Sequence, residues 1–140
     1  MNQARRVRKG AKVKRTIVYL DDESGCLNVF RETFGGEYDV RTATTPAEAR
    51  RMLAERSADI VISDQTMPGI KGTDFLSEVA ALHPSSYRVL LTGSIHLVEV
   101  IPEVSAGLIH LFVPKPWTTE LMRQMLERAS LHFALRANGD

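Results

Sequence analysis

The sequence contains one cysteine, one tryptophan and no long apolar segment. The single cysteine, Cys26, cannot form an internal disulfide, which excludes the small secreted domains that disulfides hold together. No segment approaches the roughly 20 consecutive apolar residues that a membrane-spanning helix requires, and no signal peptide is recognisable. We therefore expect a cytoplasmic protein that does not insert into a membrane.

Acidic residues are missing from the first 15 positions, which hold seven basic residues. The other 125 residues carry 11 basic and 17 acidic side chains. A basic arm of this kind can contact nucleic acid or an anionic membrane, but the pattern is a weak signal. We expect residues 1–15 to be a disordered, solvated arm, residues 16–136 to be one domain and residues 137–140 to be a tail.

Short apolar runs recur along the rest of the chain, at residues 16–20, 38–43, 59–63, 87–91 and 108–113. Runs of this length are typical of strands buried on both faces of a parallel sheet. Segments with apolar residues at helical spacing lie between them. The capping box at Thr45 and Glu48, with Pro46 at the first helical position, is one clear helix start. Five strand-helix units predict a doubly wound α/β domain with right-handed crossovers.

Charged and hydroxyl side chains follow four of these runs. They are Asp21, Asp22, Asp64, Thr92 and Lys115. Because the carboxyl ends of parallel strands meet at one edge of a sheet, we expect these side chains to lie together. Three close carboxylates repel one another unless a cation compensates. Oxygen ligands without a nearby Cys or His pair favour Mg²⁺ or Mn²⁺, so the pattern predicts a cation and phosphoryl site.

The same residues lie in motifs that resemble the receiver domain of bacterial two-component response regulators. The motifs are Tyr19-Leu-Asp-Asp-Glu23, Asp64-Gln-Thr-Met-Pro-Gly-Ile-Lys-Gly72, Leu91-Thr-Gly93 and Val113-Pro-Lys-Pro-Trp117. The resemblance covers residues 16–136 and implies a flavodoxin-like fold with strand order 2-1-3-4-5 and five helices. The stretch 91–117 resembles receivers that are often attached to cyclic-dinucleotide phosphodiesterase or other output domains. We expect either a stand-alone receiver or the N-terminal part of a longer regulator.

The resemblance implies that Asp64 accepts a phosphoryl group, because carboxylates can act as covalent nucleophiles. It assigns Asp22 and Asp64 as direct Mg²⁺ ligands, the backbone carbonyl of Thr66 as a third, and Asp21 as a ligand through water. Lys115 and Thr92 would stabilise the phosphoryl oxygens. Such a domain catalyses only its own phosphorylation and dephosphorylation.

Other residues around the site take secondary roles in this interpretation. Gly93 leaves room for the phosphoryl group, and Ser94 flanks the site together with Thr66. Phe112 corresponds to an aromatic residue that turns inward when Thr92 engages the phosphoryl group. Receivers of this kind commonly have a cis peptide bond at the position of Pro116.

The phosphodonor is expected to be a separate protein. The four histidines show no nucleophile or metal pattern, so the donor would be a sensor histidine kinase or a histidine phosphotransfer protein. We do not expect the receiver itself to bind nucleic acid.

Residues 95–102 form a segment that is apolar nearly all round, although a helix there should have a solvent face. If Leu97, Ile101 and Val104 point inward at helical spacing, Val98 and Val100 are left on the surface. Surface apolar residues of this kind often mark a contact site.

In the resembling receivers, the face made by the fourth helix, fifth strand and fifth helix carries phosphorylation-dependent docking or dimerisation. We expect this face, centred on Val98, Val100 and Phe112, to bind an output partner, an output domain or a second copy once Asp64 is phosphorylated. The alternative is that the basic arm or the tail after Phe133 covers it.

Three other functions share part of this pattern. A flavodoxin-like phosphatase with an aspartate nucleophile generally has a second acid two residues on, where this chain has Thr66. A nucleotide-binding domain would have a glycine-rich turn after the first strand, where this chain has acidic residues. The alternative that stays open is a phosphorylation-independent docking module with a receiver fold.

Overall fold

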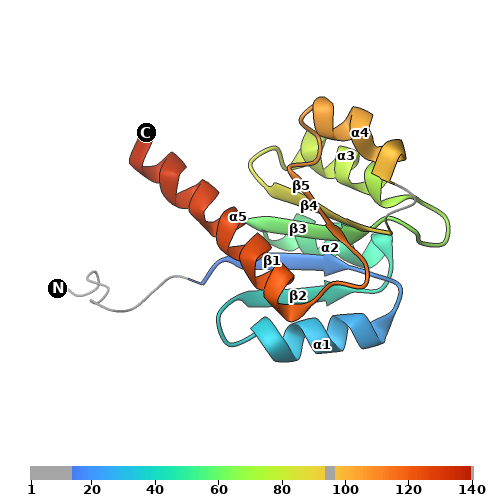
Figure 1. Cartoon of the computed structure of the whole chain (residues 1–140), viewed down its shortest axis with the longest axis horizontal. Coiled ribbons are helices and arrows are strands. Elements are labelled where there is room, and N and C mark those ends of the chain that lie inside the picture. Colours follow the sequence, from blue (N-terminus) through green and yellow to red (C-terminus); the bar gives the residue numbers. More distant parts are fainter. Residues whose placement is uncertain (1–13, 94–96, 140) are drawn as a thin grey trace.

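The structure is a computed structural model that describes residues 14–93 and 97–139, in which strands and helices alternate (Figure 1). The strands are β1 (Thr16–Leu20), β2 (Asp39–Ala43), β3 (Ile60–Asp64), β4 (Tyr87–Thr92) and β5 (Leu111–Pro114). The helices are α1 (Ser24–Phe34), α2 (Pro46–Glu55), α3 (Gly72–Leu82), α4 (Leu97–Ser105) and α5 (Thr119–Gly139). Most of the predicted basic arm lies outside the described residues.

The strands form one parallel sheet in the order β2-β1-β3-β4-β5, which confirms the predicted fold class. Because all five strands run in the same direction, their carboxyl ends lie along one edge, where the arrowheads point in Figure 1. The register brings Asp64 beside Leu91 and Thr92 beside Pro114. Polar residues at these strand ends therefore become neighbours in space.

Apolar side chains fill both faces of the sheet, because successive residues of a strand point to opposite sides. On one face, Ile17 and Tyr19 of β1 join the cluster that packs against α1 and α5. On the other face, Val18 and Leu20 join the cluster beneath α2, α3 and α4. Strands β3 and β4 are buried along their whole length, as their unbroken apolar runs predict.

Helix α2 begins as its capping box predicts. The Thr45 hydroxyl accepts a hydrogen bond from the Glu48 backbone N–H at 3.2 Å, and Pro46 occupies the first helical turn. The Glu48 carboxylate accepts a bond from the Thr44 N–H at 2.8 Å. This start places α2 against the β1 and β2 side of the sheet.

Strand β5 begins three residues later than the predicted start at Leu108. The backbone N–H groups of Leu108 and Ile109 both donate to the Glu103 carbonyl, at 2.9 and 3.4 Å. Gly107 turns the chain with φ +81°, a conformation that glycine adopts at little cost. The Glu103 carbonyl at the end of α4 therefore binds backbone N–H groups that a longer β5 would need for pairing with β4.

The prediction for the faces of α4 is wrong at two described positions. Val100, predicted to lie outside, is fully buried, and Ile101, predicted to lie inside, is 55% exposed. Val104 packs inward as predicted, one helical turn after Val100. The side chain of Val98 lies outside the described residues. Because both sides of this segment are apolar, the pattern alone did not define which side faces the sheet.

A buried arginine ties together the opposite edge of the sheet. Arg88 is 5% exposed, and its guanidinium donates to the carbonyls of Leu108 at 2.7 Å and Ser86 at 2.9 Å. A longer bond of 3.4 Å reaches the Gly107 carbonyl. These bonds join the turn before β4 to the turn between α4 and β5. Burial lowers the pKa of the guanidinium.

The last helix, α5, packs Met122, Met125, Leu126 and Ala129 into the core. Its C-terminal half extends past the sheet in Figure 1. Arg15 lies over the Phe133 ring at 5.0 Å and so holds the start of β1 against this helix. Within the described ranges, no helix has both the length and the apolar character needed to cross a bilayer.

Candidate functional site

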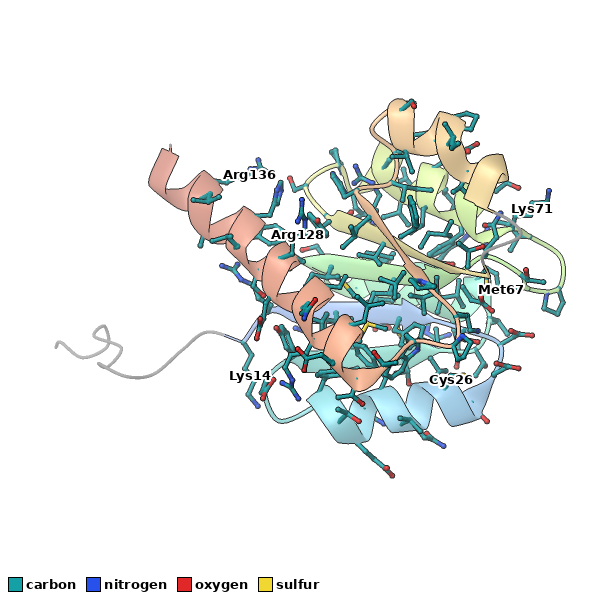
Figure 2. The ribbon with its side chains drawn as sticks, in the orientation of Figure 1. Lys14, Cys26, Met67, Lys71, Arg128 and Arg136 are labelled. Carbon is teal, nitrogen blue, oxygen red and sulfur yellow. The ribbon has the colours of Figure 1, made fainter. Side chains whose placement is uncertain are left out.

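The predicted site residues meet at the carboxyl edge of the sheet. Asp21 follows β1, Asp64 ends β3, Thr92 ends β4 and Lys115 follows β5. Backbone hydrogen bonds hold them in place, from Asp21 N–H to the Ala43 carbonyl at 3.1 Å and from Lys115 N–H to the Thr92 carbonyl at 3.0 Å. Cys26 on α1 and Met67 in the loop after β3 lie at this same edge, away from Lys14 and Arg136 (Figure 2).

Three carboxylates form the base of the site. Asp21, Asp22 and Asp64 each offer an oxygen atom within 4.8 Å of the others. Asp21 is fully buried and Asp64 is 5% exposed, whereas Asp22 is exposed to solvent. Burial raises the pKa of Asp64, and the neighbouring charge of Asp21 raises it further. The cluster therefore carries unfavourable negative charge that a cation would relieve.

Lys115 supplies positive charge from across the sheet. Its Nζ lies 3.3 Å from Oδ2 of Asp21, 3.3 Å from Oδ2 of Asp64 and 3.6 Å from Oε1 of Glu23. Burial alone would lower the pKa of Lys115, but the carboxylates of Asp21 and Asp64 outweigh it and raise the pKa. The side chain therefore remains an ammonium ion at neutral pH.

The donor atoms of the carboxylate cluster suit Mg²⁺, which prefers oxygen ligands. A second group, Asp21, Glu23 and Cys26, also lies within 4.8 Å. However, burial raises the pKa of the Cys26 thiol, and a hydrogen bond to Glu23 raises it further, so the protonated sulfur is a poor ligand. The all-oxygen group is the better candidate. The ligand role of the Thr66 carbonyl stays a prediction.

Thr92 and Gly93 border the cluster. Thr92 is 1% exposed, and its hydroxyl donates to the Gly93 carbonyl at 3.2 Å, a weak local bond that a better acceptor can replace. A Cβ added at Gly93 would meet no atom within 4 Å, which is consistent with space kept for a ligand. Ser94 lies outside the described residues, so its flanking role stays a prediction.

Two neighbours of Asp64 hold the loop after β3 closed. A Cβ added at Gly72 would overlap the Asp64 carbonyl oxygen and lie 2.8 Å from Leu90, so glycine is required there. The buried Gln65 accepts a bond from the Thr73 N–H at 2.8 Å through its side chain, and one from the Gly72 N–H at 3.0 Å through its carbonyl. Neither Gly72 nor Gln65 was predicted to have a role.

Tyr19 makes a further contact in the site, which was not predicted from the sequence. Its hydroxyl donates to Oδ2 of Asp21 at 3.0 Å. The signal was present, because Tyr19 and Asp21 are two residues apart at the end of a strand and so share a face. The tyrosine lay inside an apolar run, where its ring alone accounts for its presence.

Three further residues lie close to Lys115 in the sequence. The Lys115–Pro116 peptide bond is cis. Trp117 packs at the start of α5, with its ring centroid 6.1 Å from Phe30. Phe112, on the edge strand β5, is 39% exposed and so points outward in this state.

Comparison with known proteins gives one consistent answer. A family model described as "Response regulator receiver domain" matches residues 17–127. The hydrogenase transcriptional regulatory protein HoxA of Cupriavidus necator is 30% identical over 120 residues, 83% of this chain and 25% of that protein. The chain spans about a quarter of the length of the curated relatives it matches.

Two solved structures agree with this match. One is the signal receiver domain of an HD domain-containing protein from Pseudomonas fluorescens, with 26% identity, a TM-score of 0.79 and coverage of 86% of this chain and 97% of that one. The other is a response regulator receiver domain protein from Clostridium thermocellum, with 28% identity, a TM-score of 0.79 and coverage of 86% and 98%.

Proposed function

This chain belongs to the response regulator receiver domain family, and on that premise we propose that Asp64 accepts a phosphoryl group in a Mg²⁺-dependent reaction. The donor is a phosphohistidine on a sensor histidine kinase or a histidine phosphotransfer protein. The observation that carries the proposal is the position of Lys115, whose Nζ lies 3.3 Å from carboxylate oxygens of both Asp21 and Asp64. An ammonium ion and a carboxylate nucleophile are thereby held at one strand edge.

In the transfer step, one carboxylate oxygen of Asp64 attacks the phosphorus atom. The new P–O bond forms as the P–N bond to the donor imidazole breaks, and the bonding electron pair leaves with the imidazole. Asp22, Asp64, the Thr66 carbonyl and Asp21 would hold Mg²⁺, which would supply positive charge against the phosphoryl oxygens.

The side chains of the protein complete the stabilisation. The ammonium of Lys115 turns toward a phosphoryl oxygen, because the phosphoryl oxygens are negatively charged, whereas the Asp64 carboxylate loses its charge when it forms the P–O bond. The Thr92 hydroxyl gives up its weak bond to the Gly93 carbonyl and donates to a second phosphoryl oxygen. The space beside Gly93 accommodates the group.

The change at Thr92 is passed on to a surface of α4, β5 and α5. Exposed apolar side chains on these elements include Ile101, Phe112, Leu121, Leu131 and Leu135. Of the residues predicted to centre this face, Phe112 is exposed and Val100 is buried, and the side chain of Val98 lies outside the described residues. Phe112 is outward in the present state and turns inward when Thr92 moves. The altered face then binds an output partner, an output domain of a longer regulator, or a second copy of this chain.

The second candidate is a docking module that works without phosphorylation. It requires no chemistry from the site, so it gives no reason for a buried acid and a lysine to be held together. Burying a charged side chain costs free energy unless it is paired with an opposite charge. The presence of the carboxylates, the lysine and the threonine at one site therefore favours the phosphoacceptor.

The test is incubation with acetyl phosphate and Mg²⁺, followed by intact-mass measurement. The proposal predicts one added phosphoryl group, none when EDTA replaces Mg²⁺, and none in Asp64→Asn. Unchanged mass in the wild-type protein with Mg²⁺ would favour the docking module. A single phosphoryl group retained in Asp64→Asn would place the acceptor elsewhere.

A further inference from the structure

The hydroxyl of Tyr19 lies beneath the site and shares an acceptor with Lys115. It donates to Oδ2 of Asp21 at 3.0 Å, and the same oxygen lies 3.3 Å from Lys115 Nζ. The other oxygen, Oδ1, accepts the Glu23 backbone N–H at 3.0 Å. Asp21 and Tyr19 are both fully buried. Three protein donors therefore satisfy one carboxylate that has no contact with solvent.

These donors differ in how freely they can move. Tyr19 lies in β1, paired on one side with Thr42 and on the other with Ile62, and its ring packs edge-on against Phe30 at 4.9 Å. The strand pairing and the ring packing therefore hold the Tyr19 oxygen beside Asp21. Lys115 lies after β5, and its long side chain lies within 4 Å of three different carboxylates. Tyr19 is thus the fixed donor and Lys115 the movable one.

The difference matters once a phosphoryl group arrives. Lys115 must then turn from Asp21 toward the phosphoryl oxygens. A buried carboxylate that loses a partner without replacement is strongly destabilised. Because Tyr19 keeps its bond to Oδ2, that oxygen stays hydrogen-bonded while Lys115 moves.

We propose that Tyr19 is a positioning residue that holds Asp21 in place so that Lys115 can transfer to the phosphoryl group, an inference that rests on the proposed phosphoacceptor function. Tyr19 touches neither the phosphoryl group nor the metal in this account. Tyr19 lowers the free energy that is lost when the Lys115 ammonium leaves Asp21. Its effect should therefore appear when a phosphoryl group is bound, and hardly at all when only the metal is bound.

The test compares two affinities in one variant. Tyr19→Phe removes the hydroxyl and keeps the ring against Phe30. We expect its affinity for beryllofluoride, a phosphoryl mimic, measured by calorimetry in saturating Mg²⁺, to fall about tenfold, the scale of one hydrogen bond to a charged group. Its affinity for Mg²⁺ alone should stay within about twofold of wild type, because Lys115 remains on Asp21 in that state.

Tyr87→Phe is the matched control. Tyr87 is a buried tyrosine at the start of β4, whereas the site lies at the end of that strand. Its ring stacks on His110 with a centroid distance of 4.8 Å. Removing its hydroxyl should leave both affinities unchanged. An equal fall in Mg²⁺ and beryllofluoride affinity in Tyr19→Phe would mean a purely structural role and would overturn the proposal. Unchanged beryllofluoride affinity would overturn it as well.

The same experiment distinguishes a failure of the Tyr19 proposal from a failure of the proposed phosphoacceptor function. If the wild-type protein binds Mg²⁺ but no beryllofluoride, the phosphoacceptor function fails and the role of Tyr19 fails with it. If wild type binds beryllofluoride and Tyr19→Phe binds it equally well, only the role of Tyr19 fails.

A measurement on the wild-type protein covers the case in which Tyr19→Phe does not fold. The buried Tyr19 hydroxyl proton should give a slowly exchanging proton NMR signal, and the signal should persist when beryllofluoride binds. Loss of the signal on binding would show that the hydroxyl leaves Asp21, contrary to the proposal.

Discussion

Lys115 Nζ lies 3.3 Å from Oδ2 of Asp64, although Asp64 ends β3, Lys115 follows β5 and β4 lies between these two strands. The lysine side chain thus reaches past the end of β4 to the end of β3, and also to Asp21 at the end of β1. Charges contributed by three strands are therefore close only when the sheet is assembled. The site and the fold should be lost together on unfolding, and substitutions in the site should alter stability as well as chemistry.

Asp64→Asn should stabilise the metal-free protein at neutral pH. Burial and Asp21 raise the pKa of Asp64 in the folded state, so the wild-type protein loses stability as the pH rises above the value for the unfolded chain, about 4. Asparagine removes that loss. In thermal unfolding with EDTA, we expect a gain of about 1 kcal/mol at neutral pH that shrinks toward pH 4. A variant less stable than wild type at neutral pH would contradict this.

Asp22→Ala should weaken Mg²⁺ binding while leaving the fold intact, because Asp22 is exposed and lies in the carboxylate cluster. Calorimetry should show that the affinity for Mg²⁺ falls by more than about tenfold. A loss of about tenfold is what removing a residue that only supports a metal ligand causes. Glu32→Ala removes an exposed acid from α1 and serves as the control. Equal affinities in the two variants would exclude Asp22 as a ligand.

Substitutions on the face of α4, β5 and α5 should block association that depends on phosphorylation. Sedimentation with Mg²⁺ and beryllofluoride should show wild type associating with itself or with its partner, and the double variant Ile101→Glu with Phe112→Glu should not associate. Leu82→Glu introduces the same charge at an exposed leucine of α3 and should behave as wild type.

Thr92→Ala tests whether this surface is coupled to the site. The variant keeps the carboxylates and Lys115, so it should still bind Mg²⁺ and beryllofluoride. Without the hydroxyl it should no longer gain association when the mimic binds. Association that rises in Thr92→Ala as much as in wild type would show that the face responds by another route.

Gly72→Ala should destabilise the protein by about 3 kcal/mol, because the added methyl group overlaps the Asp64 carbonyl oxygen and crowds Leu90. Urea unfolding would measure the loss. Gly36→Ala is the control, since an added Cβ there meets no atom within 4 Å. Gly36→Ala should change stability little or raise it slightly. Similar losses in both variants would point to a general intolerance of alanine.

The positions of the site residues could be predicted because they depend on a simple geometric rule. Asp21, Asp64 and Thr92 each end or follow an apolar run, and parallel strands place their carboxyl ends along one edge. The capping box at Thr45 likewise defined the start of α2 through purely local bonds. In these cases neighbouring residues in the sequence carry the information.

The remaining features depend on contacts between distant segments. In α4, Val100 packs into the core while the adjacent Ile101 is exposed, and the apolar pattern gives no basis for choosing between them. The late start of β5 depends on the Glu103 carbonyl, which holds the N–H groups of Leu108 and Ile109. The bond from Tyr19 to Asp21 was hidden because an aromatic ring fits an apolar run whether or not its hydroxyl has a partner.

Reductive trapping of the phosphorylated wild-type protein tests the central claim most directly. Borohydride reduces an aspartyl phosphate to homoserine, so peptide mass mapping after acetyl phosphate and Mg²⁺ treatment identifies the acceptor without any substitution. We expect homoserine at position 64 and unmodified aspartate at positions 21 and 22, with no homoserine when EDTA is present. Homoserine at position 21 or 22, or none anywhere in a fully mapped chain, would contradict a phosphoacceptor role for Asp64.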